Sequence, residues 1–169
     1  MIAPPTGRGY LSLNIFTDGS VHPQSGIGYG AYLIISDVDL AIEMLRTQVK
    51  VQRFEGTSST KLELQVLLSA LNEINDLSYK ANIYTDSQNI VRLPLRKEYL
   101  QENNYRSKKN ELIKNHLLYK EFYKITSNLD CDFTKVKGHK VSRDKDKIDR
   151  VFNLVDKASR AALRSFKNG

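Results

Sequence analysis

The chain has 169 residues and a formal net charge of +7, with 27% charged and 40% hydrophobic residues. Its length suits one compact domain, and its composition is typical of a folded globular protein rather than a disordered chain. No run approaches the roughly 20 apolar residues that cross a membrane, and residues 1–9 lack the basic start and apolar core of a signal peptide. We therefore expect a flexible tail at residues 1–10, a single domain at residues 11–166 and no membrane partner.

The cysteine content bears on the cellular location of the protein, and the charge distribution bears on the class of its binding partner. The single cysteine, Cys131, cannot form an internal disulfide, which favours a reducing, cytoplasmic location. Residues 1–91 carry six Lys and Arg against nine Asp and Glu, a balance of −3, whereas residues 92–169 carry twenty against ten, a balance of +10. The basic half indicates a polyanion such as nucleic acid, although a solvated basic surface has the same composition.

Three strands are predicted first in chain order. Residues 11–17 form an apolar run that ends at Asp18, and runs at residues 32–35 and 49–54 complete an antiparallel meander. The glycines at residues 26–30 have the spacing G-x-G-x-G and lead into a strand, so a tight turn into a hairpin explains them better than nucleotide binding. Residues 37–46 receive no assignment.

Helices and two more strands follow. Hydroxyl side chains at residues 57–60 can cap a helix that runs to about Ile74, and residues 81–85 form a fourth strand. A short helix should start at residues 87–91, and residues 92–124 should be helical with a break near Asn103. A fifth strand at residues 131–136 leads through a charged loop ending at Asp149 into an amphipathic helix. This order predicts an α/β or α+β domain with a mixed five-stranded sheet.

Four acids stand where this architecture meets solvent. Asp18 and Asp86 each follow an apolar strand, so two strands could carry both to one edge of the sheet. Glu63 and Asp156 flank the apolar stripes of their helices, although an acid in a first helical turn, as Glu63 could be, also complements the helix dipole. Neighbouring carboxylates repel each other unless a divalent cation lies between them.

Five short motifs, in this order and setting, resemble the type 1 ribonuclease H family over residues 11–165. Each motif alone is unspecific, whereas the ordered set is hard to obtain by chance. The motifs are Thr17-Asp18-Gly19-Ser20, Lys61-Leu62-Glu63-Leu64, Tyr84-Thr85-Asp86-Ser87, Val136-Lys137-Gly138-His139, and Asp156 followed by Ala158-Ser159-Arg160-Ala161-Ala162.

The resemblance implies a ribonuclease H-like fold with helices on both faces of the sheet. It also implies an endoribonuclease that hydrolyses the RNA strand of RNA–DNA hybrids by two-metal-ion catalysis and leaves 5′-phosphate and 3′-hydroxyl ends. His139 matches the family's histidine that assists proton transfer or product release, and we expect a monomer. Two Mg²⁺ ions, or Mn²⁺, would be bound by the family's four carboxylates, which match Asp18, Glu63, Asp86 and Asp156.

Substrate contacts follow from the same resemblance. Ser58-Ser59-Thr60 replace the family's Thr-Asn-Asn sequence, which holds a DNA-strand phosphate, and Gln24 lies near its loop asparagine. A basic protrusion in altered form matches the element that grips the hybrid, although the chain has no Trp for the family's usual anchors. The full set of expected substrate contacts is Gly19, Ser20, Gln24, Ser58, Ser59, Thr60, Arg106, Lys108, Lys109 and Lys114.

Alternatives remain open for the fourth acid and for the activity. Asp149 has the spacing from His139 that is usual in compact family members, but the residues after Asp156 match the family pattern, so Asp156 is preferred. A fold does not guarantee activity. A catalytically silent nucleic-acid-binding domain and a DNA nuclease of the same fold are therefore the rival interpretations.

Overall fold

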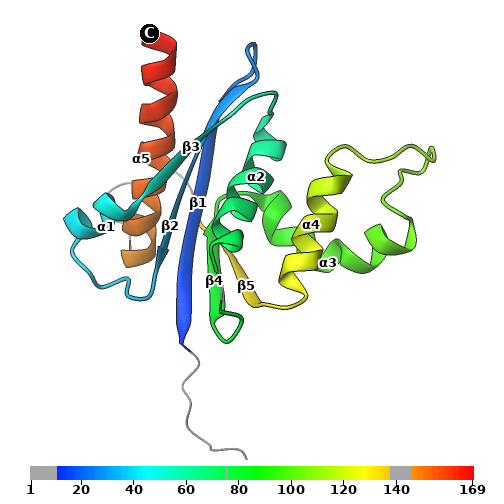
Figure 1. The fold of residues 1–169 in the computed structure, drawn as a ribbon, viewed down its shortest axis with the longest axis horizontal. Helices are drawn as coiled ribbons and strands as arrows, with labels where there is room; N and C mark the ends of the chain where they lie inside the picture. The colour runs from blue at the N-terminus through cyan, green and yellow to red at the C-terminus, as the bar shows by residue number, and fades with distance from the viewer. Residues whose placement is uncertain (1–10, 75, 138–145) are drawn as a thin grey trace, which may run out of the picture.

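The structure, a computed structural model, describes residues 11–74, 76–137 and 146–169, and its centre is a five-stranded sheet in the order β3-β2-β1-β4-β5 (Figure 1). Its first three strands pair antiparallel, while β4 pairs parallel with β1 and β5 parallel with β4. The predicted mixed sheet with an antiparallel meander is confirmed. The strands are β1 (Ser12–His22), β2 (Ile27–Ile35), β3 (Lys50–Phe54), β4 (Lys80–Thr85) and β5 (Asp130–Lys135).

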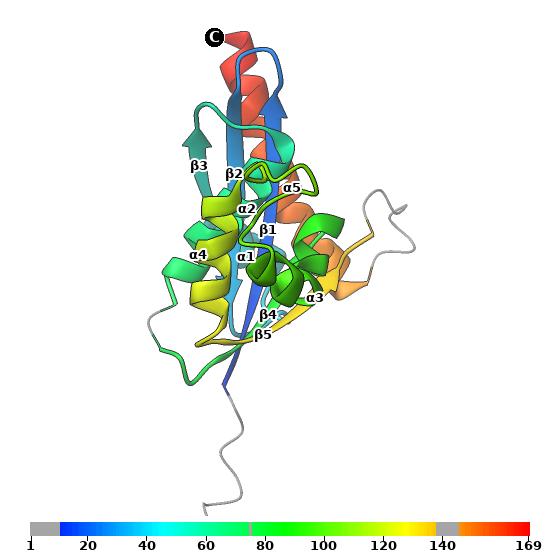
Figure 2. The same cartoon turned by 90° about the vertical axis from the view of Figure 1, so that its right-hand side faces the viewer.

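Helices cover both faces of this sheet (Figures 1 and 2). One hydrophobic cluster lies between the sheet and α2, α3 and α4, and a second lies between the sheet and α1 and α5. No helix in the described part of the chain is both long and apolar enough to cross a membrane. The helices are α1 (Ile42–Gln48), α2 (Ser59–Asn72), α3 (Gln88–Glu102), α4 (His116–Thr126) and α5 (Lys147–Asn168).

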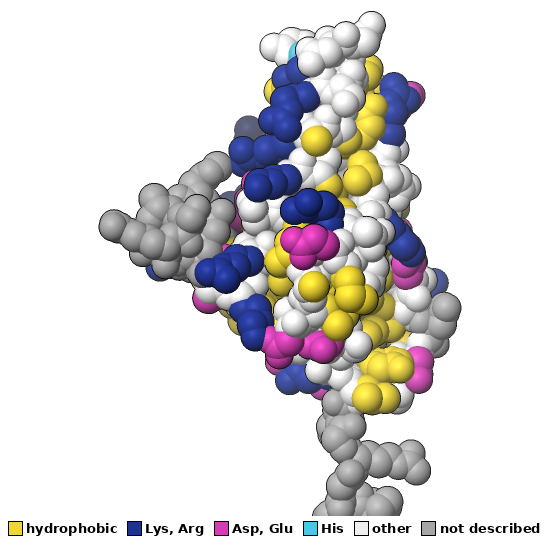
Figure 3. All heavy atoms as spheres, turned by 90° about the vertical axis from the view of Figure 1, so that its left-hand side faces the viewer, with side chains coloured by type: hydrophobic (Ala, Val, Ile, Leu, Met, Phe, Trp, Pro, Cys, Tyr) yellow, Lys and Arg dark blue, Asp and Glu magenta, His cyan; other side chains and the backbone are white. Residues whose placement is uncertain are grey.

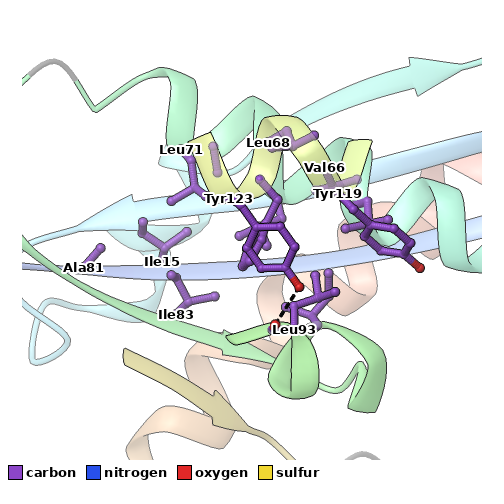
Figure 4. Packing of buried hydrophobic residues seen from close by; sticks show 14 of the residues in the cluster. Ile15, Val66, Leu68, Leu71, Ala81, Ile83, Leu93, Tyr119 and Tyr123 are labelled. Carbon is purple, nitrogen blue, oxygen red and sulfur yellow. Dashed lines mark hydrogen bonds between the residues drawn. The ribbon is translucent and has the colours of Figure 1, made fainter. Parts of the chain in front are cut away.

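Alternation along the strands separates the two clusters. Ile15 of β1 and Ile83 of β4 face α2, whereas the next residue in β1, Phe16, faces α5. In the first cluster, Tyr123 of α4 donates a hydrogen bond of 2.7 Å to the carbonyl of Leu93 in α3 (Figure 4). Burying one large apolar side chain, such as that of Ile83, contributes about 1.5–3 kcal/mol to folding. The buried side chains of the two clusters therefore hold the helices against the sheet.

The strand β1 does not end at Asp18 but continues to His22. Asp18 pairs with Ala31, and β2 begins at Ile27 rather than at residue 32, because the two strands form one long antiparallel ladder. The predicted turn role of the glycines therefore holds only for Gly26, whose φ is +68°. The others lie inside β2.

The strand glycines allow α2 to approach the sheet closely. A Cβ added at Gly30 would collide with the side chain of Val66, and one added at Gly28 would lie 2.8 Å from Leu62. Both contacts come from α2. Because Glu63 is the neighbour of Leu62 in α2, this close packing also determines where Glu63 lies.

Helix boundaries differ from the predicted ones for local reasons. The short helix predicted to start at residues 87–91 and the helical region predicted from residue 92 form one helix, which runs through Pro94 to Glu102. The predicted break after it is confirmed by Asn104, whose φ is +48°. At the other end of the chain, α5 starts at Lys147 instead of near residue 151. Asp146 and Asp149 form a capping box there, which satisfies two backbone N–H groups.

Candidate active site

The register of β1 and β4 brings Asp18 and Asp86 to neighbouring positions. Their parallel pairing ends with Phe16 opposite Tyr84, and the two rings stack with centroids 4.8 Å apart. Asp18 comes two residues after Phe16, and Asp86 comes two residues after Tyr84, so both acids lie just beyond the last residue pair of β1 and β4. Because side chains alternate along a strand, Asp18 lies on the same face as Phe16, which is the face that α5 covers.

The helix α5 delivers Asp156 to this point. The hydroxyl of Ser159 in α5 donates to Oδ2 of Asp18 at 3.2 Å and lies 3.2 Å from the hydroxyl of Ser20. Asp156 precedes Ser159 by about one turn, and its Oδ1 pairs with Nε of Arg160 at 2.7 Å. The strand β1 and the helix α5 are thus joined at the acids themselves.

Glu63 reaches the same place from the opposite face of the sheet. Its Oε2 accepts a 2.6 Å hydrogen bond from the hydroxyl of Ser87, the residue directly after Asp86 and the N-cap of α3. Glu63 is the fifth residue of α2, beyond the first turn, so the alternative role in complementing the helix dipole is wrong. A contact across elements, rather than the dipole, accounts for its position.

Burial and neighbouring acids raise the pKa values of Asp18 and Glu63. Burial, followed by the charge of Asp86, raises the pKa of Asp18 to about 7; Asp156 raises it further, while hydrogen bonds from the Gly19 backbone and Ser159 lower it. Burial raises the pKa of Glu63, the hydrogen bond from Ser87 lowers it, and the charge of Asp86 raises it. Negative charge is therefore crowded here beyond what the neighbouring groups neutralise.

Asp86 connects the members of this cluster electrostatically. Burial and then the charge of Asp156 raise its pKa, whereas its own backbone N–H, Lys135 and Arg160 lower it. Asp86 thus interacts with acids from β1, α2 and α5. The four predicted acids converge on the end of β4.

A divalent cation fits this site by donor type. Carboxylate oxygens are the ligands that Mg²⁺, Mn²⁺ and Ca²⁺ prefer, and a cation would relieve the repulsion among the acids. Within residues 11–74, 76–137 and 146–169, however, no three His, Cys, Asp or Glu side chains form a ready metal-binding group. Ser159, Ser87 and Arg160 instead each hold one carboxylate oxygen, of Asp18, Glu63 and Asp156 in that order.

Asp149 occupies a different position from Asp156. It is 7% exposed in the first turn of α5, where its carboxylate accepts from the N–H of Asp146 at 3.2 Å and its own N–H donates to Asp146 at 2.8 Å. Asp156 is seven residues further along, and its charge acts on Asp18 and Asp86. Geometry therefore places Asp156 with the other acids and gives Asp149 a capping role.

The expected substrate residues fall into two groups. Gly19 and Ser20 follow Asp18 in β1, Gln24 is exposed in the β1–β2 turn, and residues 58–60 form the N-cap and first turn of α2. The basic residues of the predicted protrusion lie apart, exposed on the loop at residues 103–115 between α3 and α4, to the right of α2 in Figure 1. This second group consists of Arg106, Lys108, Lys109 and Lys114.

His139 belongs to the segment of residues 138–145, which lies outside the described residues, so its predicted role stays a prediction.

The structure adds four residues that sequence reasoning did not assign to the site. Two left a signal: Ser159 interrupts an apolar helical stripe, and Arg160 follows Asp156 by four residues, the spacing of a helical ion pair. The other two are Ser87 and Lys135.

The sheet order, the helices on both faces and the acids at the end of β4 define a protein with the ribonuclease H-like fold. The family model described as RNase H matches residues 11–158. The chain belongs to the RNase H family.

Similar proteins agree with this assignment. The Ribonuclease H of Caldicellulosiruptor saccharolyticus is 25% identical over 157 residues, covering 90% of this chain and 97% of that protein. That of Legionella pneumophila strain Lens is 26% identical over 148 residues, covering 85% and 96%.

Solved structures with the same fold include the following two. A foamy viral protease-reverse transcriptase in complex with RNA/DNA hybrid has a TM-score of 0.70 at 14% identity, covering 95% of this chain and 21% of that one. LC9-RNase H1, described as a type 1 RNase H with the type 2 active-site motif, has a TM-score of 0.67 at 13% identity, covering 93% and 74%. At these identities the likeness concerns the fold alone.

Proposed function

We propose that the protein is an endoribonuclease that hydrolyses the RNA strand of RNA–DNA hybrids and leaves 5′-phosphate and 3′-hydroxyl ends. The observation that carries this proposal is the convergence of Asp18, Glu63, Asp86 and Asp156 in a chain of the RNase H family. Relatives named Ribonuclease H and a structural neighbour in complex with RNA/DNA hybrid support the substrate class.

Two Mg²⁺ ions, or Mn²⁺, are the cofactors that this donor set suits, with Asp18, Glu63, Asp86 and Asp156 as ligands. When bound, the ions supply an activated water and stabilise the leaving 3′ oxygen of an in-line displacement. The chain's own contribution is orientation. Ser159 fixes one oxygen of Asp18, and Ser87 fixes one oxygen of Glu63, so that these carboxylates lose less freedom on binding.

The substrate would contact both groups of polar residues. Gly19 and Ser20 follow Asp18 in β1, Gln24 lies in the turn after this strand, and the hydroxyls of residues 58–60 start the helix that carries Glu63. We assign these residues to contacts with the two strands of the hybrid. We assign His139 to proton transfer or product release. Phosphate contacts on the basic loop are assigned to Arg106, Lys108, Lys109 and Lys114.

A catalytically silent nucleic-acid-binding domain is the second candidate. One observation favours it: Arg160 pairs with Asp156, and the described acids are held separately. The first candidate is preferred because all four carboxylates are present and Asp18 has a pKa raised to about 7, so the charge is not already compensated. A site used only for binding phosphates would gain nothing from this accumulation of acids.

One assay separates these candidates. Labelled RNA–DNA hybrid, double-stranded RNA and double-stranded DNA are incubated with the protein in Mg²⁺ and in EDTA. Cutting confined to the RNA strand of the hybrid, abolished by EDTA, is the expected result, and a ligase should join the downstream fragment without prior phosphorylation. Binding without cutting would establish the second candidate, and cutting of double-stranded DNA would identify a DNA nuclease.

We further propose that the chain acts as a cytoplasmic monomer with its domain at residues 11–166. Its single cysteine, which is half-buried, supports a reducing location. Light scattering at several protein concentrations checks the monomer, and cell fractionation checks the location.

A further inference from the structure

A row of cations extends from the candidate active site along α5. Residues 157–169 contain Lys157, Arg160, Arg164 and Lys167 and no Asp or Glu. All four cations are exposed. Lys and Arg side chains form a row along this side of the molecule in Figure 3, the side on which α5 runs in Figure 1.

The row is continuous with the acids. Arg160, Arg164 and Lys167 follow Asp156 by 4, 8 and 11 residues, which places them along one face of a helix with 3.6 residues per turn. At a rise of about 1.5 Å per residue, the row extends about 16 Å beyond Asp156. Its far end is anchored, since the ring of Phe166 lies 6.3 Å from that of Tyr29 in β2.

An ordinary solvated helix face does not explain this pattern well. Like charges three and four residues apart weaken a helix by about 0.2–0.5 kcal/mol per pair. Of the four cations, Arg160 alone has an ion pair with a carboxylate in the described part of the chain. Among the described residues, no carboxylate lies within 4 Å of Arg164 or Lys167. The helix dipole favours cations only in the last turn, which accounts for Lys167 but not for the row.

We propose that Arg164 and Lys167 bind the phosphate backbone of the duplex outside the cleaved step. This proposal rests on the proposed function and adds a phosphate-binding surface on α5 to it. With about 3.4 Å of duplex per base pair, a reach of 16 Å corresponds to about five base pairs from the acids. Contacts to phosphate fix the register of a duplex without reading its sequence, so the row aligns the hybrid across the active site.

The test compares two charge-matched double variants. Arg164→Gln/Lys167→Gln removes the row's far end, and Arg46→Gln/Lys124→Gln removes two exposed cations from α1 and α4. Glutamine is a good helix former, so α5 should stay folded, which thermal melting checks. On a long hybrid, the row variant should have a higher KM than wild type and an unchanged kcat. The slope of the logarithm of its hybrid affinity against the logarithm of the salt concentration should be shallower by about 0.9 for each lost contact. The control variant should keep the wild-type slope.

A second comparison locates the contact. In hybrids with a central RNA block, the DNA-paired flank on one side or the other is shortened to about three base pairs, less than the row's reach of about five. When one flank is short, the row variant and the control should have equal KM values and equal salt dependence. When the other flank is short, the two variants should still differ.

Two results would overturn the contact: equal KM and salt slopes for the two variants on the long hybrid, or a difference that persists with either flank shortened. A wild-type protein that neither binds nor cuts any hybrid would instead overturn the proposed function, and this contact with it.

Discussion

Single carboxylates in this protein have roles that depend on what touches them. Asp18 is half-buried and crowded by other acids, whereas Asp149 is buried and shares two hydrogen bonds with Asp146. The first arrangement stores repulsion that a cation can relieve, and the second satisfies a helix end. Replacing the aspartate should therefore change protein stability in opposite directions at positions 18 and 149.

Asp18→Asn should abolish cleavage and stabilise the metal-free protein. Loss of a carboxylate that is central to a metal site costs several kcal/mol of transition-state stabilisation, so the rate should fall by about 10³-fold or more. Removing the crowded charge should raise the free energy of unfolding at pH 8 by about 1–2 kcal/mol. Urea denaturation in EDTA and a hybrid-cleavage assay measure the two effects; full activity of the variant would contradict the whole assignment.

The stability of the metal-free protein should also depend on pH through Asp18. Its pKa in the folded protein is about 7, above the ordinary 3.8, so the folded state binds more protons than the unfolded state between these values. This contribution to the free energy of unfolding therefore declines as pH rises from about 4 to 7. Denaturation curves in EDTA at several pH values should show a shallower decline for Asp18→Asn than for wild type.

Asp149→Asn and Asp156→Asn test the choice between the two candidate fourth acids. Asp149→Asn weakens the capping box and should lower stability by about 1 kcal/mol while cleavage survives. Asp156→Asn should lose Mg²⁺-dependent cleavage with little loss of stability. Denaturation and cleavage assays on both variants suffice, and loss of cleavage in Asp149→Asn alone would reverse the assignment.

At the scale of elements, the close approach of α2 to the sheet depends on the glycines of β2. Gly30 leaves room for Val66, and the neighbouring Gly28 leaves room for Leu62. The helix carrying Glu63 is thus positioned by missing side chains two strands away from Asp86. A sequence pattern of alternating apolar residues does not reveal this, because the contact joins residues that are distant in the chain.

Gly30→Ala should destabilise the protein by about 1–3 kcal/mol, because an overpacked core must shift. Val66→Ala alone should also destabilise, by leaving a cavity. The double variant Gly30→Ala/Val66→Ala should lose less than the sum of the two, since the added methyl fills the space that valine vacates. Urea denaturation of the four proteins gives the coupling, and strict additivity would show that the two residues do not compete for space.

At the scale of the whole molecule, metal binding and folding should be linked. Ligands that bind only the folded state add RT ln(1 + [L]/Kd) to stability, about 2.7 kcal/mol at 100 times Kd. Mg²⁺ should therefore raise the melting temperature of wild type and of Asp149→Asn, but not that of Asp18→Asn. An equal rise in all three proteins would indicate a nonspecific salt effect instead of binding at the acids.

Sequence periodicity predicted most of the fold because its elements carry local signals. The amphipathic stripe of α5 and the apolar runs of β4 and β5 were correctly interpreted, and the break after Glu102 followed from its turn residues. The boundaries that failed depend on partners. The strand β1 continues past Asp18 only because β2 pairs with it there, and α5 starts early only because Asp146 and Asp149 cap each other.

The sequence by itself determined which acids could form a site, because each follows an apolar run or lies beside an apolar helical stripe in an ordered set of motifs. Only the tertiary structure decided how they are held. Ser159 reaches Asp18 across 141 positions of sequence, and Ser87 reaches Glu63 across 24. Such contacts depend on strand register and helix packing, which bring distant residues together and leave no local pattern.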